Sequence, residues 1–198
     1  MGRIVIAGLL GGIVVFCWGA AAHMVLPLGM VGVHYEALDS EDAVLAALKA
    51  GLPESGMYFL PGMDMSIADE TQRMKAMEEK GTGGSAIVVY HSAGGPEMSG
   101  RLMAVEFAMN VACALIAALI VAAMPVKYTT RVLVVGLLGL FAWLEVEGSY
   151  WNWYGYPDAY TAAQGVIAVV GWLLAGLAIA SVVGGPRKDG AAEVSQAR

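Results

Sequence analysis

The sequence predicts a mainly α-helical membrane protein: a four-helix transmembrane bundle with a small α/β extracytoplasmic insertion between the first and second spans. Hydrophobic residues make up 58% of the chain and charged residues only 14%, well below the roughly 25% charged residues of ordinary soluble domains. Four apolar stretches each approach or exceed the ~20 residues that a helix needs to cross a bilayer. They lie at about residues 4–28, 102–125, 132–150 and 160–184.

One long acidic segment follows the first apolar stretch and sets the predicted boundaries. The first stretch resembles a secretory signal, but its apolar run reaches Met30 and exceeds the about 7–15 residues of a signal's apolar region. We therefore expect it to remain as a span. The chain divides into a first transmembrane helix at 1–30, an extracytoplasmic α/β segment at 31–100, a second transmembrane helix at 101–126, a third at 127–150, an aromatic outer loop at 151–159, a fourth helix at 160–185 and a cytoplasmic tail at 186–198.

The basic residues predict the orientation. Lys127 and Arg131 lie between the second and third spans, Arg3 precedes the first, and Arg187 and Lys188 follow the fourth. Because Lys and Arg near span ends are retained in the cytoplasm, we expect both termini inside and the acidic segment outside. The net charge of −6 argues against a nucleic-acid partner, since a polyanion repels an acidic protein.

The acidic segment is predicted to contain two helices and two short strands. The helices run from Asp39-Ser40 to Gly51, and from a capping box formed by Ser66 and Asp69 to Gly81. The strands lie at 57–60 and 86–90. A unit of this size buries little surface, so we expect it to lean on the membrane bundle or on a partner protein.

Small residues recur at four-residue spacing in two spans. Gly8 and Gly12 form a GxxxG pair, and Ala104, Ala108 and Ala112 repeat the spacing in the second span. Such spacing lets membrane helices approach closely. It leaves open whether the helices that meet belong to one chain or to two copies.

A carboxylate and an amide lie inside the second span. Glu106 and Asn110 are four residues apart and therefore share one helix face. Ionisable groups within a membrane face a bundle interior or mark a path for ions or protons. The alternative is that Glu106 lies near the outer interface and pairs with Arg101 or with another helix.

Carboxylates and aromatic rings gather where the third span ends. Glu145 and Glu147 precede a block that includes Trp151 and Trp153. Such a block is typical of the aromatic belt at a membrane interface. The functional alternative is a mouth where these rings and carboxylates, with Asp158, receive a ligand or a partner helix. Asp158 is also a candidate N-cap of the fourth helix.

Histidines and methionines outside the spans, or near their edges, suggest a metal site. His23, His34 and His91 offer imidazole ligands, and Met63 and Met65 offer thioethers, which favour Cu(I). No HxH, HxxxH or CxxC spacing joins them into a coordination sphere. We therefore predict no metal or other cofactor, with copper as the alternative.

Three short blocks carry a resemblance to known proteins: Met24-Val25-Leu26-Pro27, Glu54-Ser55-Gly56-Met57-Tyr58-Phe59-Leu60-Pro61 and Trp151-Asn152-Trp153-Tyr154-Gly155. They resemble parts of a group of small bacterial integral membrane proteins that has no assigned activity. The resemblance implies a location in the bacterial inner membrane. It implies no catalytic residue.

The favoured hypothesis is a non-catalytic membrane subunit or assembly factor whose outer segment docks on a membrane complex. The first alternative is a small oligomeric transporter or ion-conducting protein that uses Glu106, Asn110 and Glu145. The second is a membrane enzyme that acts on a lipid, with a histidine and a carboxylate as acid and base. The expected partners are membrane lipid and either other membrane-protein subunits or further copies of the chain.

Overall fold

The computed structural model describes residues 1–95 and 98–184 of the 198-residue chain. These residues form two compact units: the first contains Met1–Tyr35 and the described residues from Ser99 onward, and the second contains Glu36–Met98. The segment predicted as a cytoplasmic tail, residues 186–198, lies outside the described residues. The prediction of a mainly helical chain with four helices able to cross a membrane and a small sheet is confirmed.

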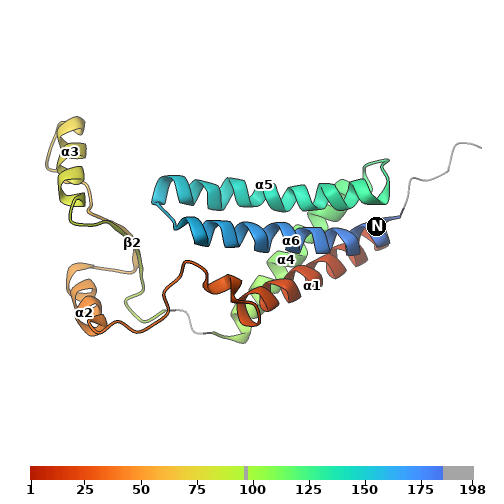
Figure 1. Ribbon diagram of the computed structural model, residues 1–198, viewed down its shortest axis with the longest axis horizontal. Helices are drawn as coiled ribbons and strands as arrows, with labels where there is room; N and C mark the ends of the chain where they lie inside the picture. Colours follow the sequence, from red (N-terminus) through yellow and green to blue (C-terminus); the bar gives the residue numbers. More distant parts are fainter. Residues whose placement is uncertain (96–97, 185–198) are drawn as a thin grey trace, which may run out of the picture. The chain divides into compact units, whose positions relative to one another are not determined.

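Four long helices dominate the first unit (Figure 1). They are α1 (Gly2–Met24), α4 (Gly100–Ala122), α5 (Tyr128–Tyr154) and α6 (Asp158–Val183), and each is long and apolar enough to cross a membrane. Their outward faces are apolar as well, since Leu133, Leu137 and Phe141 follow one another along the exposed side of α5. Apolar faces of this extent are unfavourable in water, whereas lipid tails are as apolar as leucine.

Small side chains fill the centre of this unit. Gly8 and Gly12 of α1 lie against Leu115 and Val111 of α4, so the GxxxG pair joins two helices of one chain. The repeat on α4 lies instead on the exposed side of that helix: Ala104, Ala108 and Ala112. The buried core collects alanine, valine and isoleucine from all four helices: Ala7, Ala114, Ala117, Ala118, Val121, Val135, Ala175 and Ile179.

Tryptophan rings lie over glycines of a neighbouring helix. An added Cβ at Gly171 would lie 2.7 Å from the Trp18 ring, and one at Gly165 would lie 2.9 Å from the Trp143 ring. Each glycine therefore makes room for one ring, and these contacts join α6 to both α1 and α5. The pairs are Trp18 with Gly171, Trp143 with Gly165 and Trp172 with Gly139.

Two helices end elsewhere than predicted. α1 ends at Met24, and a short 3₁₀ helix, η1 (Pro27–Met30), follows, because proline has no amide hydrogen to continue an α-helix. α5 continues to Tyr154, so residues 151–154, predicted as part of an outer loop, are its last turn. That stretch contains no helix breaker before Gly155, whose φ of 67° favours glycine.

Arg131, predicted only as a marker of orientation, is 3% exposed at the start of α5. Its Nε donates to the Val121 oxygen at 3.1 Å, its Nη2 donates to the Met124 oxygen at 3.2 Å, and its Nη1 donates to the Gly184 oxygen. These carbonyls lie at the ends of α4 and α6, and those of Val121 and Met124 also accept from the Met124 and Val126 amides at 3.4 and 2.9 Å. One guanidinium thus ties the ends of two helices to the start of a third.

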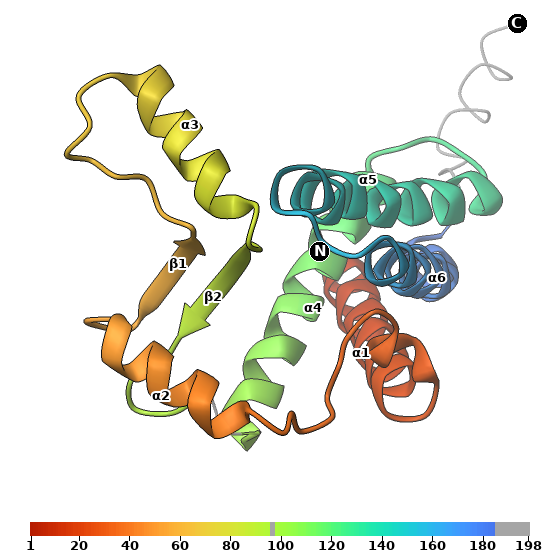
Figure 2. The ribbon, with the colours of Figure 1, turned by 60° about the vertical axis from the view of Figure 1, so that its left-hand side comes forward.

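The second unit consists of α2 (Glu41–Gly51), β1 (Gly56–Leu60), α3 (Glu70–Gly81) and β2 (Ala86–Tyr90). The strands pair antiparallel, with Met57 opposite Val89 and Phe59 opposite Ile87 (Figure 2). None of the described residues of this unit is buried. The sheet and the two helices are therefore built without a core of their own.

The start of α3 differs from the prediction. Asp69 is the N-cap, and its carboxylate accepts a hydrogen bond from the Gln72 amide at 2.8 Å. The predicted capping box is wrong because Ser66 is held elsewhere: its amide and its hydroxyl donate to the Asp64 carboxylate at 3.0 and 2.6 Å. The hydroxyl bond, followed by the amide bond, lowers the pKa of Asp64 below its usual value.

Candidate functional site

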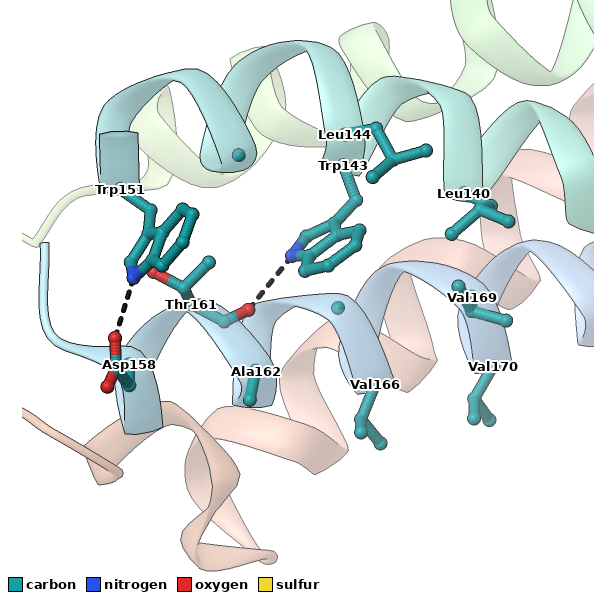
Figure 3. A pocket seen from close by; sticks show the side chains of 12 residues that line it. Leu140, Trp143, Leu144, Trp151, Asp158, Thr161, Ala162, Val166, Val169 and Val170 are labelled. Carbon is teal, nitrogen blue, oxygen red and sulfur yellow. Dashed lines mark hydrogen bonds between the residues drawn. The ribbon is translucent and has the colours of Figure 1, made fainter. Parts of the chain in front are cut away.

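A groove of about 900 Å³ lies between α5 and α6, in the halves of these helices nearest to the turn that joins them (Figure 3). This volume is within the about 300–1,000 Å³ of small-molecule sites. Its walls are mainly aliphatic, with Leu140 and Leu144 on α5 and Val166 and Val170 on α6. The groove is open to the surface of the unit and is not an enclosed cavity.

The polar groups of the groove gather at the end next to the turn (Figure 3). The Trp151 indole donates to the Asp158 carboxylate at 2.6 Å, and the Trp143 indole donates to the Thr161 backbone oxygen at 2.8 Å. Both indole donors are thereby satisfied. The hydroxyl of Thr161 is buried and has no hydrogen-bond partner among the residues that the structure describes.

Local sequence explains why these groups meet. Gly155 ends α5 and Asp158 begins α6, and so short a link makes the two helices antiparallel neighbours. Asp158 occupies the first turn of α6, where the helix dipole favours a carboxylate. Gly148 and Ala162 line the groove with little side-chain bulk of their own, which leaves the space open.

The structure assembles only part of the predicted site. Trp151 and Asp158 line the groove, whereas Glu145 and Trp153 do not, and Trp153 is 77% exposed. Glu147 also lies outside the groove wall, and its Oε2 is enclosed without a hydrogen-bond partner in the described part of the chain.

Tyrosine rings form a separate cluster at the same turn. The ring centroids of Tyr150 and Tyr156 are 5.4 Å apart, and those of Tyr156 and Tyr160 are 5.7 Å apart. Tyr150 also lies 5.4 Å from Tyr154. The aromatic residues predicted to form one interfacial belt therefore lie in two separate places: Trp151 lines the groove, and the tyrosines contact one another.

The other predicted pair lies on α4. The Asn110 amide donates to Glu106 Oε1 at 3.1 Å, so the partner of Glu106 is Asn110 and not Arg101. Neither Glu106 nor Asn110 lines the groove. The path predicted through Glu106, Asn110 and Glu145 thus has no counterpart in this groove.

The candidate metal ligands lie in different surroundings. His23 bonds through Nδ1 to the Gly19 backbone oxygen at 2.9 Å. His34 and His91 are exposed, and so are Met63 and Met65. Within residues 1–95 and 98–184, no group of three or more His, Cys, Asp or Glu residues is placed to hold a metal ion.

Sequence reasoning missed the groove itself, and with it Trp143 and the Thr161 hydroxyl. One signal was present: Trp143 and Trp151 are eight residues apart, which places both on similar faces of α5. Comparison of the chain with protein-family models, with curated proteins and with solved structures gives no match.

Proposed function

We propose that this protein is a non-catalytic accessory subunit of the bacterial inner membrane. In this proposal α1, α4, α5 and α6 form a transmembrane bundle with both termini in the cytoplasm. The second unit is the extracytoplasmic insertion, and it docks on other membrane-protein subunits. The observation that carries the proposal is the absence of any buried residue among the described residues of that unit.

An apolar sheet face is the surface best suited to docking. Residues that are opposite one another in an antiparallel pair share a face, and the register places Met57 beside Val89 and Phe59 beside Ile87. Met57 is 51% exposed, Phe59 49% and Val89 63%. At about 1.5–3 kcal/mol for each fully buried apolar side chain, completing the burial of these half-exposed residues would contribute about 3 kcal/mol.

The ends of the helices support the proposed orientation. Arg131 brings the end of α4 and the end of α6 to the start of α5, and Gly184 lies near the Arg3 side chain. Arg3, Lys127 and Arg131 therefore gather at one end of the first unit. Basic residues at one end of a bundle favour a cytoplasmic location for that end.

Site-specific photo-cross-linking in intact cells tests the docking. A photoreactive amino acid at Val89 is expected to capture a discrete membrane-protein partner, whereas one at the exposed Gln72 of α3 is not. Val89→Lys is expected to abolish co-purification of that partner, and Gln72→Lys is the matched control. Equal capture from both positions, or co-purification that survives Val89→Lys, would contradict the proposal.

A further inference from the structure

We propose that the groove between α5 and α6 binds one phospholipid whose headgroup carries an ammonium group, with an acyl chain along the groove and the ammonium at Asp158. This inference rests on the membrane placement of α5 and α6 in the proposed function. It does not depend on the docking of the second unit.

The length of the groove matches one lipid leaflet. Along α6 its wall extends from Asp158 to Val170, which corresponds to about 18 Å at 1.5 Å per residue. Half of a hydrocarbon core about 30 Å thick is about 15 Å. An acyl chain that begins at the headgroup level would therefore lie in the groove over its whole length.

The polarity of the groove is that of an amphipathic occupant. Asp158, Trp151 and Thr161 mark one end, and aliphatic side chains line the rest. The groove extends along only half of each helix, which matches the thickness of one leaflet and not the full length of a transmembrane helix. A lipid, with one polar end and an apolar tail as long as one leaflet, matches both the polarity and the length of the groove.

The charge at the polar end selects the headgroup. Asp158 is exposed, and an ionised carboxylate accepts further hydrogen bonds beside the one from Trp151. The groove wall contains no Lys or Arg among its described residues, so an anionic headgroup meets only negative charge there. An ammonium group pairs with the carboxylate, and the half-exposed Trp151 ring beside it adds a cation–π surface.

The Thr161 hydroxyl is a second, independent indication. Thr161 is only 6% exposed, and its Oγ1 has no hydrogen-bond partner in the described part of the chain. Buried hydroxyls are normally paired. A polar side chain left unpaired at the same end of the groove as Asp158 is consistent with a site built for a polar headgroup.

Native mass spectrometry of the full chain, released from nanodiscs that contain equal amounts of phosphatidylethanolamine and phosphatidylglycerol, tests the proposal. We expect retention of one phosphatidylethanolamine over phosphatidylglycerol by about fivefold, the equivalent of about 1 kcal/mol for a partly exposed ion pair. Asp158→Asn keeps an oxygen that accepts from Trp151 but removes the charge, and it is expected to abolish the preference. Ala162→Phe fills the groove and is expected to abolish retention of both lipids.

Two matched controls isolate the groove. Glu145→Gln removes a carboxylate from α5 outside the groove, and Ala112→Phe adds the same ring to the exposed side of α4; both are expected to retain phosphatidylethanolamine like the wild type. Equal retention of the two lipids by the wild type would overturn the proposal. The proposal would also be overturned if Asp158→Asn kept the lipid preference that Glu145→Gln keeps, or if Ala162→Phe retained lipid as Ala112→Phe does. A photoreactive residue at Val166 that captured a protein instead of a lipid would overturn it as well.

Discussion

Replacing Arg131 by methionine tests the role of the buried guanidinium. Methionine is also long and unbranched, but it donates no hydrogen bond, so the Val121, Met124 and Gly184 oxygens lose their shared donor. A hydrogen bond from a charged donor contributes about 1.5–3 kcal/mol to stability, and an ordinary one about 0.5–1.5 kcal/mol. The Val121 and Met124 oxygens keep the amides of Met124 and Val126 as donors. We therefore take about 1 kcal/mol for each of these two lost hydrogen bonds and about 2 kcal/mol for the one to Gly184.

These contributions sum to about 4 kcal/mol. Removing the guanidinium also removes the cost of burying its charge, so we expect Arg131→Met to lower the free energy of unfolding by about 3 kcal/mol. The measurement is a titration with sodium dodecyl sulfate in detergent micelles, followed by circular dichroism. Arg131→Lys is expected to lower the free energy of unfolding by about half as much as Arg131→Met, because lysine keeps the charge but not the planar set of donors.

Lys127→Met is the matched control, since Lys127 is exposed and lies four residues before Arg131. Surface substitutions of this kind change stability by no more than about 0.5 kcal/mol. If Arg131→Met unfolded at the same detergent fraction as Lys127→Met, the guanidinium would not be holding the helix ends together. The reasoning from the three hydrogen bonds would then be refuted.

Further predictions concern other contacts. Gly12→Ala is expected to cost about 1–3 kcal/mol in the same titration, because its Cβ would lie 2.6 Å from the Val111 Cα, whereas Gly19→Ala meets nothing within 4 Å and is expected to be neutral. Asp69→Ala removes the N-cap of α3 and is expected to cost that helix about 1 kcal/mol, seen as faster amide exchange; unchanged exchange would contradict the assignment of the cap. Ser66→Ala is expected to raise the pKa of Asp64 in an NMR titration. Because the folded pKa is the lower one, this group's contribution to stability is present above the unfolded pKa and is lost as pH falls through the folded value, and an unmoved pKa would refute the role of Ser66.

The sequence was most informative where composition alone determines an element. Apolar runs predicted the four long helices, and the β-branched run at 86–90 predicted the strand that forms there. The end of α5 was misjudged because interfacial aromatic residues are compatible with both a loop and a helix. Gly155, whose left-handed backbone stops the helix, was the stronger signal.

The groove could be predicted only in part. The sequence predicts Trp151 and Asp158 as part of a ligand mouth, but the hydrogen bond between them depends on the rotation of α5 against α6. That rotation is set by which ring meets which glycine, as with Trp143 and Gly165, and packing of this kind is not visible in one sequence. Arg131 was underestimated for a similar reason, because Gly184 is 53 residues away in the chain.

The pairing of tryptophan with glycine has a consequence for how this sequence can vary during evolution. What packing conserves at such a contact is the combined volume of the two residues, because overfilling and underfilling both destabilise. A side chain gained at Gly171 is therefore expected to be tolerated when a smaller residue replaces Trp18, and the same is expected for Gly165 with Trp143. Related sequences would then show paired substitutions at these tryptophan and glycine positions, although the two residues of each pair lie on different helices.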